Sequence, residues 1–295
     1  MIDKRFKGLG VAMVTPFTPA GEVDFAGLRK LIQHLINGGV DYLVVMGTTG
    51  ENPTLTEYEQ RGILDTVLEE NNGKLPVVFG MGGNYTAALT HRIATYNLKG
   101  VSALLSASPY YNKPNQNGIL NHYDAVVSVS ELPVIIYNVP GRTGSNISAE
   151  TTLKLAELPG IIGTKEASGN FAQCMEILKH RPDDFLVISG DDSYTLPFIS
   201  LGMDGVISVI GNAYPTEFSD LVNKALADDF EGARIGHYAL LDLMNTIFED
   251  GSPGGIKVIL NELGICGPTL RAPLYPPSDK VIGHLRMQVD SMKQG

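Results

Sequence analysis

One lysine of this sequence stands at the end of an apolar run, where a cation needs either a partner or a chemical task. Residues 161–165 read Ile-Ile-Gly-Thr-Lys, and Glu166 follows. Burial disfavours the charged form of an amine and leaves a lone pair free to attack a carbonyl carbon as a Schiff-base nucleophile. An ion pair between Lys165 and a carboxylate is the alternative, and the lysine alone does not separate the two.

A tyrosine ends the preceding apolar run in the same way. Residues 133–137 read Pro-Val-Ile-Ile-Tyr, and residues 148–158 between the two runs have a helical pattern. Two strands joined by a helix are parallel, and neighbouring strands lie about 4.8 Å apart with their carboxyl ends at one edge of the sheet. We therefore expect Tyr137 beside Lys165, where a phenol can carry protons to and from a carbinolamine.

A short glycine-rich segment follows another apolar run. Residues 47–51 read Gly-Thr-Thr-Gly-Glu. Consecutive backbone N–H groups in such a turn, together with the hydroxyls of Thr48 and Thr49, can bind a carboxylate. An ordinary turn between a strand and a helix is the alternative interpretation.

Other polar and aromatic residues follow further runs. Arg142 lies in the loop after Tyr137, from which a guanidinium can bind a carboxylate with two hydrogen bonds. Tyr110 and Tyr111 stand in a proline-flanked segment. Taken singly, the arginine can be a solvated surface residue and the tyrosines core or interface aromatics.

Composition argues against several classes of protein. The chain has 295 residues, 43% of them hydrophobic, and a formal net charge of −10. Nucleic-acid binding needs a basic surface that neutralises phosphates, so no nucleic-acid partner is expected. Cys174 and Cys266 lack a paired spacing and the six histidines stand singly, so neither a disulfide framework nor a metal site is indicated. No phosphate-binding glycine motif occurs, and no nucleotide cofactor is expected.

The amino-terminal residues do not resemble a secretory signal, and no apolar run approaches the length of a membrane span. We therefore expect a cytoplasmic protein without a membrane partner.

Short apolar runs alternate with helical patterns along most of the chain. The runs are continuous in Val, Ile and Leu, as in parallel strands that are buried on both faces. We predict eight strands, over residues 10–14, 42–46, 77–80, 103–106, 134–137, 161–165, 186–189 and 206–209. Eight strand–helix units in a chain of this length predict an α/β fold, a (β/α)8 TIM barrel with its active site at the carboxyl ends of the strands.

After the eighth strand the pattern changes. From about residue 216 onward only helical segments are predicted, separated by glycine- and proline-rich breaks at 251–255 and 273–277. We predict a barrel over residues 1–224 and a C-terminal helical extension over residues 225–295.

Six segments, taken in order, resemble one known family. They are GTTGE at 47–51, SPYYNKP at 108–114, YNVPGRTG at 137–144, GTKEASG at 163–169, SGDD at 189–192 and GVISV at 205–209. Through them the chain resembles the dihydrodipicolinate synthases, which are pyruvate-dependent Schiff-base lyases related to N-acetylneuraminate lyase. The resemblance covers essentially the whole chain and includes residues 254–257 and 270–274.

The resemblance implies a catalytic role for four residues. Lys165 matches the lysine that forms a Schiff base with pyruvate. Tyr137, Thr48 and Tyr111 match a proton relay in which the threonine links the two phenols. In that family the tyrosine matched by Tyr111 reaches in from a neighbouring subunit.

Substrate binding is implied for four more positions. Thr49, with Thr48, matches the residues that hold the pyruvate carboxylate, and Arg142 matches the arginine that receives the carboxylate of L-aspartate 4-semialdehyde. Gly190 and Ile207 match positions whose backbone carbonyls line the site.

The activity that the resemblance implies is condensation of pyruvate with L-aspartate 4-semialdehyde in the diaminopimelate route to lysine, without metal or organic cofactor, by a homotetramer or a dimer. One alternative is another aldolase of the family, such as N-acetylneuraminate lyase or a 2-keto-3-deoxy sugar acid aldolase. Arg142 counts against it, because the neuraminate lyases lack this arginine. A catalytically silent barrel that serves as a binding protein is the second alternative.

The resemblance also bears on feedback. Lysine-inhibited members use an asparagine and a tyrosine matched by Asn84 and Tyr110, but their glutamate is replaced here by Ala88 and their histidines by Glu57 and Gln60. A cationic ligand that loses its carboxylate partner loses about 1.5–3 kcal/mol of binding free energy. We expect weak or absent inhibition by L-lysine, unless Glu57 turns into the cleft.

Overall fold

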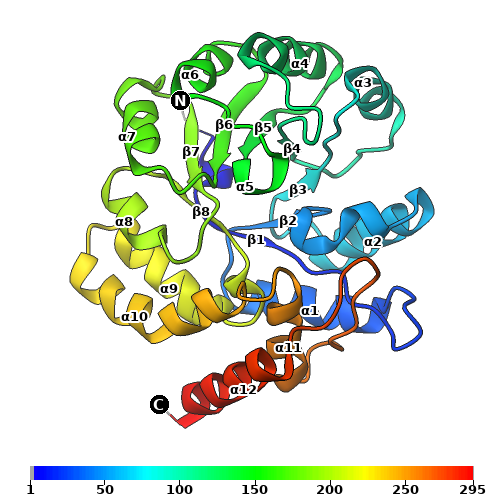
Figure 1. Ribbon diagram of the computed structural model, residues 1–295, viewed down its shortest axis with the longest axis vertical. Coiled ribbons are helices and arrows are strands. Elements are labelled where there is room, and N and C mark those ends of the chain that lie inside the picture. The colour runs from blue at the N-terminus through cyan, green and yellow to red at the C-terminus, as the bar shows by residue number, and fades with distance from the viewer. Residues whose placement is uncertain (1–2, 295) are drawn as a thin grey trace.

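The computed structural model describes residues 3–294, and its centre is a closed barrel of eight parallel strands (Figure 1). Each strand pairs with the next in the sequence, and β8 closes the ring against β1. The strands are β1 (Gly8–Ala12), β2 (Tyr42–Val45), β3 (Val77–Gly80), β4 (Ala103–Ala107), β5 (Val134–Asn138), β6 (Ile161–Glu166), β7 (Leu186–Ser189) and β8 (Gly205–Ser208). The predicted TIM barrel is confirmed.

The observed strands agree with the predicted ones to within one residue, except β1, which begins and ends two residues earlier. Val14, the last residue predicted for this strand, is buried but no longer pairs with a strand. Its N–H donates instead to Asn212 Oδ1 at 3.1 Å. An apolar run therefore predicts which residues are buried, but it does not predict where strand pairing ends.

Helices surround the barrel (Figure 1). They are α1 (Phe25–Asn37), α2 (Glu57–Asn71), α3 (Thr86–Thr95), α4 (Gln116–Val129), α5 (Pro140–Thr143), α6 (Ala149–Ala156), α7 (Phe171–His180), α8 (Thr195–Ser200) and α9 (Pro215–Leu226), with 3-10 turns η1 (Lys4–Phe6), η2 (Thr48–Gly50), η3 (Asn52–Thr54) and η4 (Ile210–Asn212). A capping box begins α2: the Glu59 N–H donates to Thr56 Oγ1, and the Thr56 N–H donates to the Glu59 carboxylate.

Aromatic side chains fill the barrel at the amino ends of its strands. Phe6 and Tyr42 are fully buried there and meet edge to face, with ring centroids 5.7 Å apart. β1 passes this cluster at Gly10, where a β-carbon would lie 2.2 Å from the Tyr42 ring. This end of the barrel is therefore a packed core.

Three helices follow α9, namely α10 (Phe230–Thr246), α11 (Gly254–Glu262) and α12 (Asp279–Gln294). α10 packs along α9, and α11 packs against α12, which lies at the lower edge of the view in Figure 1. Residues 216–294 contain no strand, as predicted. The predicted boundary at residue 224 falls within α9, and the division into two units stays a prediction.

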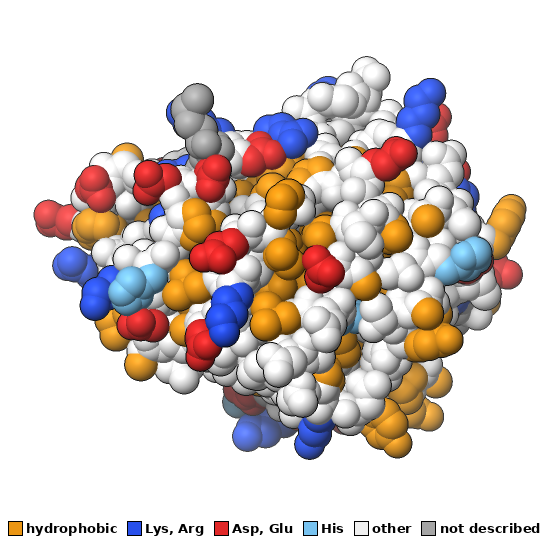
Figure 2. Space-filling model, turned by 90° about the horizontal axis from the view of Figure 1, so that it is seen from above, with side chains coloured by type: hydrophobic (Ala, Val, Ile, Leu, Met, Phe, Trp, Pro, Cys, Tyr) orange, Lys and Arg blue, Asp and Glu red, His pale blue; other side chains and the backbone are white. Residues whose placement is uncertain are grey.

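Acidic and basic side chains are interspersed on the face that Figure 2 presents, with apolar side chains between them. Among residues 3–294, no helix is both long and apolar enough to cross a membrane.

Candidate active site

A cavity of about 460 Å³ opens at the carboxyl ends of the barrel strands. This is the end at which the sequence predicts the active site. Six of the eight predicted site residues line it: Thr48, Thr49, Tyr137, Arg142, Lys165 and Gly190. The other two, Tyr111 and Ile207, are placed elsewhere.

β5 and β6 bring Tyr137 and Lys165 together, because the two residues are direct partners in the ladder between these strands. Both side chains are buried, and Lys165 Nζ lies 4.4 Å from the centroid of the Tyr137 ring. Within the described residues no carboxylate forms a salt bridge with Lys165. The predicted proximity is confirmed, and the alternative of an ion pair is not observed. This amine is placed to act as a nucleophile.

The carboxylate next to Lys165 in the sequence lies on the opposite face of β6, since side chains alternate along a strand. Glu166 accepts hydrogen bonds from Asn138 Nδ2 at 3.0 Å, from the Ser168 N–H at 2.8 Å and from Gln173 Nε2 at 3.2 Å. Burial raises the pKa of Glu166, and these hydrogen bonds oppose the shift. Glu166 is therefore bound within the layer between strand and helix and does not neutralise Lys165.

The turn after β2 lies at the edge of the cavity and has an unusual backbone. Residues on both sides of η2 adopt the left-handed conformation, Met46 with φ 60° and Glu51 with φ 54°. Each non-glycine residue in this conformation costs roughly 1–2 kcal/mol, so neighbouring contacts must hold the turn in place. One such contact is the Thr15 hydroxyl, which donates to the Gly50 carbonyl at 2.7 Å.

This turn presents the two predicted threonines. Thr48 and Thr49 both line the cavity, Thr49 being buried and Thr48 exposed. β3 leaves room for the turn at Gly80, where a β-carbon would lie 2.1 Å from the Met46 carbonyl oxygen. Both predicted threonines thus border the cavity, and their role in binding a carboxylate stays a prediction.

Gly190, at the end of β7, lies against the side chain of Lys165. A β-carbon at this position would be 2.6 Å from Ala167 Cβ and 3.0 Å from Lys165 Cε. Any side chain at position 190 would therefore displace the side chain of Lys165 or that of Ala167. The role assigned to the Gly190 carbonyl stays a prediction.

Arg142 projects from the short helix α5, which ends at the left-handed Gly144. The arginine lines the cavity and is exposed. Among the described residues no acidic side chain forms a salt bridge with it. A free guanidinium at this position can bind a carboxylate ligand with two parallel hydrogen bonds.

The two tyrosines after β4 are placed differently. Tyr110 lines the cavity, whereas the side chain of Tyr111 is 86% exposed and outside the lining. Tyr111 has a left-handed backbone with φ 72°, and its N–H donates to the Thr143 carbonyl at 3.2 Å. This hydrogen bond joins its loop to the one that carries Arg142. The proton-relay role of Tyr111 stays a prediction, and this cavity does not contain its phenol.

Ile207 lies deeper in the barrel. Its side chain is fully buried in a cluster that includes Ala12 and Ile188, and Val209, two residues later, lines the cavity instead. The assignment of the Ile207 carbonyl to the site stays a prediction.

Part of the wall comes from a region that the sequence did not connect with the site. The end of α10 and the loop after it contribute Met244, Asn245, Phe248 and Ser252. No local signal marks these residues, since α10 reads as an ordinary amphipathic helix. Only the packing of α10 on α8 and α9 brings them over the barrel.

A buried carboxylate holds the turn after β8. Asp192 accepts hydrogen bonds from the Val209 N–H at 3.0 Å and the Ile210 N–H at 2.7 Å. Burial raises the pKa of Asp192 to about 6, although these hydrogen bonds oppose the shift. Asp192 therefore positions Val209 in the cavity wall.

Glu57 and Gln60 of α2, which bear on the predicted response to L-lysine, both contact Arg92. The Arg92 guanidinium forms a salt bridge with Glu57 at 3.8 Å and donates to Gln60 Oε1. Gln60 is buried, and its amide donates to Asn52 Oδ1 at 2.8 Å. Arg92 thus lies between Glu57 and Gln60.

Both cysteines are free and buried. Burial raises the pKa of Cys174 to about 12 and that of Cys266 to about 11, which keeps the thiols protonated and unreactive. Within residues 3–294, no three His, Cys, Asp or Glu side chains are grouped as metal ligands.

The chain is similar to known proteins over nearly its whole length. The sequence model of the Dihydrodipicolinate synthetase family matches residues 5–291. The 4-hydroxy-tetrahydrodipicolinate synthase of Parabacteroides distasonis is 49% identical over 277 residues, which are 94% of this chain and 93% of that protein.

Solved structures agree with this similarity. The crystal structure of dihydrodipicolinate synthase from Aquifex aeolicus has a TM-score of 0.94 at 39% identity, covering 98% of each chain. The chloride-inhibited dihydrodipicolinate synthase from Acinetobacter baumannii, solved in complex with pyruvate, has a TM-score of 0.94 at 34% identity, covering 97% of this chain and 99% of that one.

The stability of the barrel should depend on pH through Asp192. Its pKa rises from 3.8 to about 6 on folding, so the folded state binds the proton more tightly and loses stability as the pH rises between these values. Between about pH 4 and pH 7, the free energy of unfolding of the parent should fall by up to about 3 kcal/mol more than that of Asp192→Asn. Urea unfolding of both proteins across this range measures the difference. A difference that does not vary with pH would contradict the assignment.

Proposed function

The chain belongs to the Dihydrodipicolinate synthetase family, and from this membership we infer that it has 4-hydroxy-tetrahydrodipicolinate synthase activity. This lyase reaction condenses pyruvate with L-aspartate 4-semialdehyde in lysine biosynthesis. The observation that carries the inference is the buried amine of Lys165, which has no salt bridge in the described chain and lies 4.4 Å from the Tyr137 ring centroid. An aldolase for sugar-derived aldehydes is not favoured, because relatives with nearly full coverage have the synthase name.

We propose that the reaction begins at Lys165. Its amine adds to the keto carbon of pyruvate, and loss of water gives an iminium. The iminium draws electrons from the neighbouring methyl group, which loses a proton and becomes an enamine. The enamine carbon attacks the aldehyde carbon of the second substrate, whose oxygen is protonated. The amino group of that substrate then displaces Lys165 from the imine carbon and closes the ring.

In this scheme the phenol of Tyr137 supplies and removes protons. Tyr137 is assigned this role because it is the partner of Lys165 in the pairing of β5 with β6. Thr48 connects it with the rest of the relay. No metal or organic cofactor takes part in the proposal, since the iminium serves as the electron sink.

The two substrate carboxylates are assigned to separate groups. Thr48 and Thr49, in the turn after β2, hold the pyruvate carboxylate, and Arg142 holds that of the semialdehyde. The carbonyls of Gly190 and Ile207 complete the wall. The lining of the cavity supports these roles for the threonines, Arg142 and Gly190.

Pyruvate should become covalently bound to Lys165 when borohydride is added. Reduction of the iminium leaves a stable secondary amine, which peptide mass spectrometry locates. Lys257 serves as an internal control, because it is buried like Lys165 but forms a salt bridge with Glu51. Labelling of Lys257, or none at Lys165, would contradict the proposed function.

Arg142→Ala should impair use of the semialdehyde far more than use of pyruvate. The lost charge-assisted hydrogen bonds are worth about 1.5–3 kcal/mol, so kcat/KM for the aldehyde should fall by about one to two decades. Steady-state kinetics with each substrate varied in turn measures the change. Arg234→Ala, at an exposed arginine of α10, is the control. Equal losses for both substrates in Arg142→Ala would refute the assigned role.

Tyr111 is proposed to act in the cavity of a neighbouring subunit within a homotetramer. Its side chain is 86% exposed and does not line the cavity of its own chain. An aromatic side chain with this exposure can contact a second copy of the chain.

Mixing two inactive variants should therefore restore activity. In a hybrid dimer of Tyr111→Phe with Lys165→Ala, one of the two shared sites contains every catalytic group. The activity of the mixture is compared with that of each variant alone, after subunit exchange has been verified by native mass spectrometry. No recovery despite exchange would exclude action between subunits.

Inhibition by L-lysine should be weak. Ala88 supplies no carboxylate, and Arg92 already occupies Glu57. A steady-state assay with added lysine should show half-maximal inhibition only at concentrations at least about tenfold above those of a member that keeps the glutamate. Arg92→Ala, which frees Glu57, is expected to increase the sensitivity. Strong inhibition of the parent at sub-millimolar lysine would overturn the expectation.

A further inference from the structure

The turn that carries Thr48 and Thr49 ends at a residue whose conformation and charge both need external support. Glu51 is 2% exposed and has a left-handed backbone with φ 54° and ψ 32°. Glutamate rarely adopts this conformation, and a buried carboxylate is costly unless it is paired. Contacts from elsewhere in the chain must therefore stabilise it.

Those contacts come from the C-terminal part of the chain. Lys257, on α11, donates to Glu51 Oε1 at 2.5 Å, and both side chains are fully buried. The Arg271 N–H donates to Glu51 Oε2 at 3.0 Å. Each carboxylate oxygen therefore has its own donor, and we call Glu51, Lys257 and Arg271 the Glu51 anchor.

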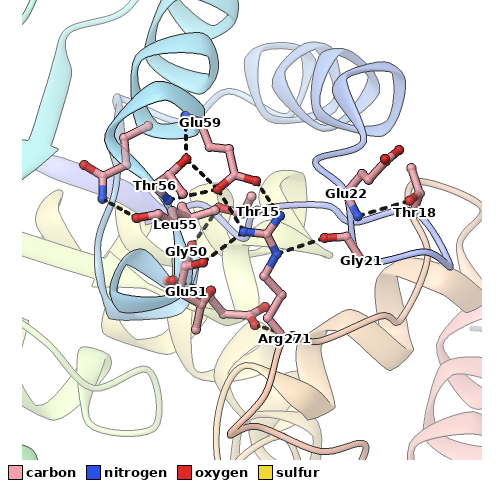
Figure 3. A network of polar contacts seen from close by, with 12 residues as sticks. Thr15, Thr18, Gly21, Glu22, Gly50, Glu51, Leu55, Thr56, Glu59 and Arg271 are labelled. Carbon is pink, nitrogen blue, oxygen red and sulfur yellow. Dashed lines mark hydrogen bonds and ion pairs between the residues drawn. The ribbon is translucent and has the colours of Figure 1, made fainter.

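The outer part of the anchor is formed by the side chain of Arg271. Figure 3 shows its guanidinium between Glu59 on α2 and the backbone on either side. It donates to Glu59 at 2.5 and 3.0 Å, to the Thr54 carbonyl at 2.9 Å and to the Gly21 carbonyl at 2.9 Å. Arg271 thus connects the residues after the turn to the start of α2.

A single aromatic ring packs against both cations of the anchor. Lys257 Nζ lies 4.3 Å and Arg271 Cζ 4.5 Å from the centroid of the Phe17 ring. Lys257 also donates to the Thr269 carbonyl at 2.8 Å. Burial lowers the pKa of Lys257, and the Glu51 carboxylate opposes this shift by stabilising the charged form of the lysine.

We propose that Lys257 and Arg271 are positioning residues for the reaction. Lys257 acts through Glu51, and Arg271 acts through its N–H to Glu51 and its guanidinium to the Thr54 carbonyl. Together they hold the turn so that Thr48 and Thr49 meet the carboxylate of pyruvate. The proposal rests on the proposed function. Neither residue lines the cavity. The path from the anchor to the substrate runs through three residues of backbone, from Glu51 back to Thr48.

The alternative is that the anchor contributes stability alone. The two hypotheses predict different affinities of the folded sites for pyruvate. Loss of stability lowers the fraction of active enzyme and hence the apparent kcat, but the remaining folded sites keep their affinity. A displaced turn weakens pyruvate binding at every folded site. It does not change the binding of the semialdehyde, which is assigned to Arg142.

The test uses the charge-neutral variant Glu51→Gln/Lys257→Met. It removes both charges of the pair together, so that neither remains buried without a partner. The matched control is Glu150→Gln/Lys154→Met, which removes an exposed glutamate–lysine pair of α6. For each protein we would measure the pyruvate concentration that gives half-maximal borohydride trapping on Lys165, and the KM of both substrates.

We expect the half-maximal pyruvate concentration and the pyruvate KM of the anchor variant to rise about tenfold, because small displacements of binding groups have large effects. The KM of the semialdehyde should stay within about twofold of the parent value, and the control should match the parent. A parent that traps pyruvate and an anchor variant with the same half-maximal concentration would overturn the positioning role alone. A parent that does not trap pyruvate would overturn the proposed function.

Arg271→Gln provides a second test if the anchor variant is not recovered as folded protein. The side chain of Arg271 is 19% exposed, so this substitution is milder. It should raise the half-maximal pyruvate concentration about threefold. A folded Arg271→Gln protein with the parent value would then overturn the proposal.

Discussion

The alternation of side chains along β6 is the constraint on which the site depends. It directs Lys165 into the barrel and Glu166 into the layer beneath the helices, where Asn138, Ser168 and Gln173 bind the carboxylate. A slip of one residue in the register would exchange the two side chains and place the carboxylate in the cavity. The pairing of β5 with β6 therefore determines the partner of Lys165, and alternation along β6 directs Glu166, its neighbour in the sequence, away from the amine.

Two buried lysines of this chain illustrate how surroundings decide the chemistry of one side chain. Lys257 is fully buried with a carboxylate against its amine and serves as a structural cation. Lys165 is 5% exposed, faces a cavity and has the ring of Tyr137 as its neighbour. A paired amine is held by its counterion, whereas an amine without a salt bridge that faces an open cavity is accessible to a carbonyl substrate.

Backbone strain is concentrated around the site and is held by the rigid parts of the fold. Met46, Glu51, Tyr111 and Lys113 all have positive φ angles, and all lie in loops at the carboxyl ends of strands. Such conformations persist only where several contacts determine them together. The barrel supplies a packed base, and the C-terminal segment supplies the buried ion pair at Glu51. The C-terminal helices thus take part in building the site as well as covering the barrel.

The sequence by itself determined the barrel and the proximity of Tyr137 to Lys165. Unbroken apolar runs indicate strands that are buried on both faces, and a polar residue that ends such a run lies at the carboxyl end of the barrel. Tyr137 and Lys165 were predictable on that ground, and Thr48, Thr49 and Arg142 because they stand in the segments that follow such runs. Only the tertiary structure decided that Met244 and Phe248 close the cavity, that Tyr111 leaves it and that Lys257 pairs with Glu51 across 206 positions. These relations arise from the packing of helices far apart in the chain, and local periodicity contains no information about such contacts.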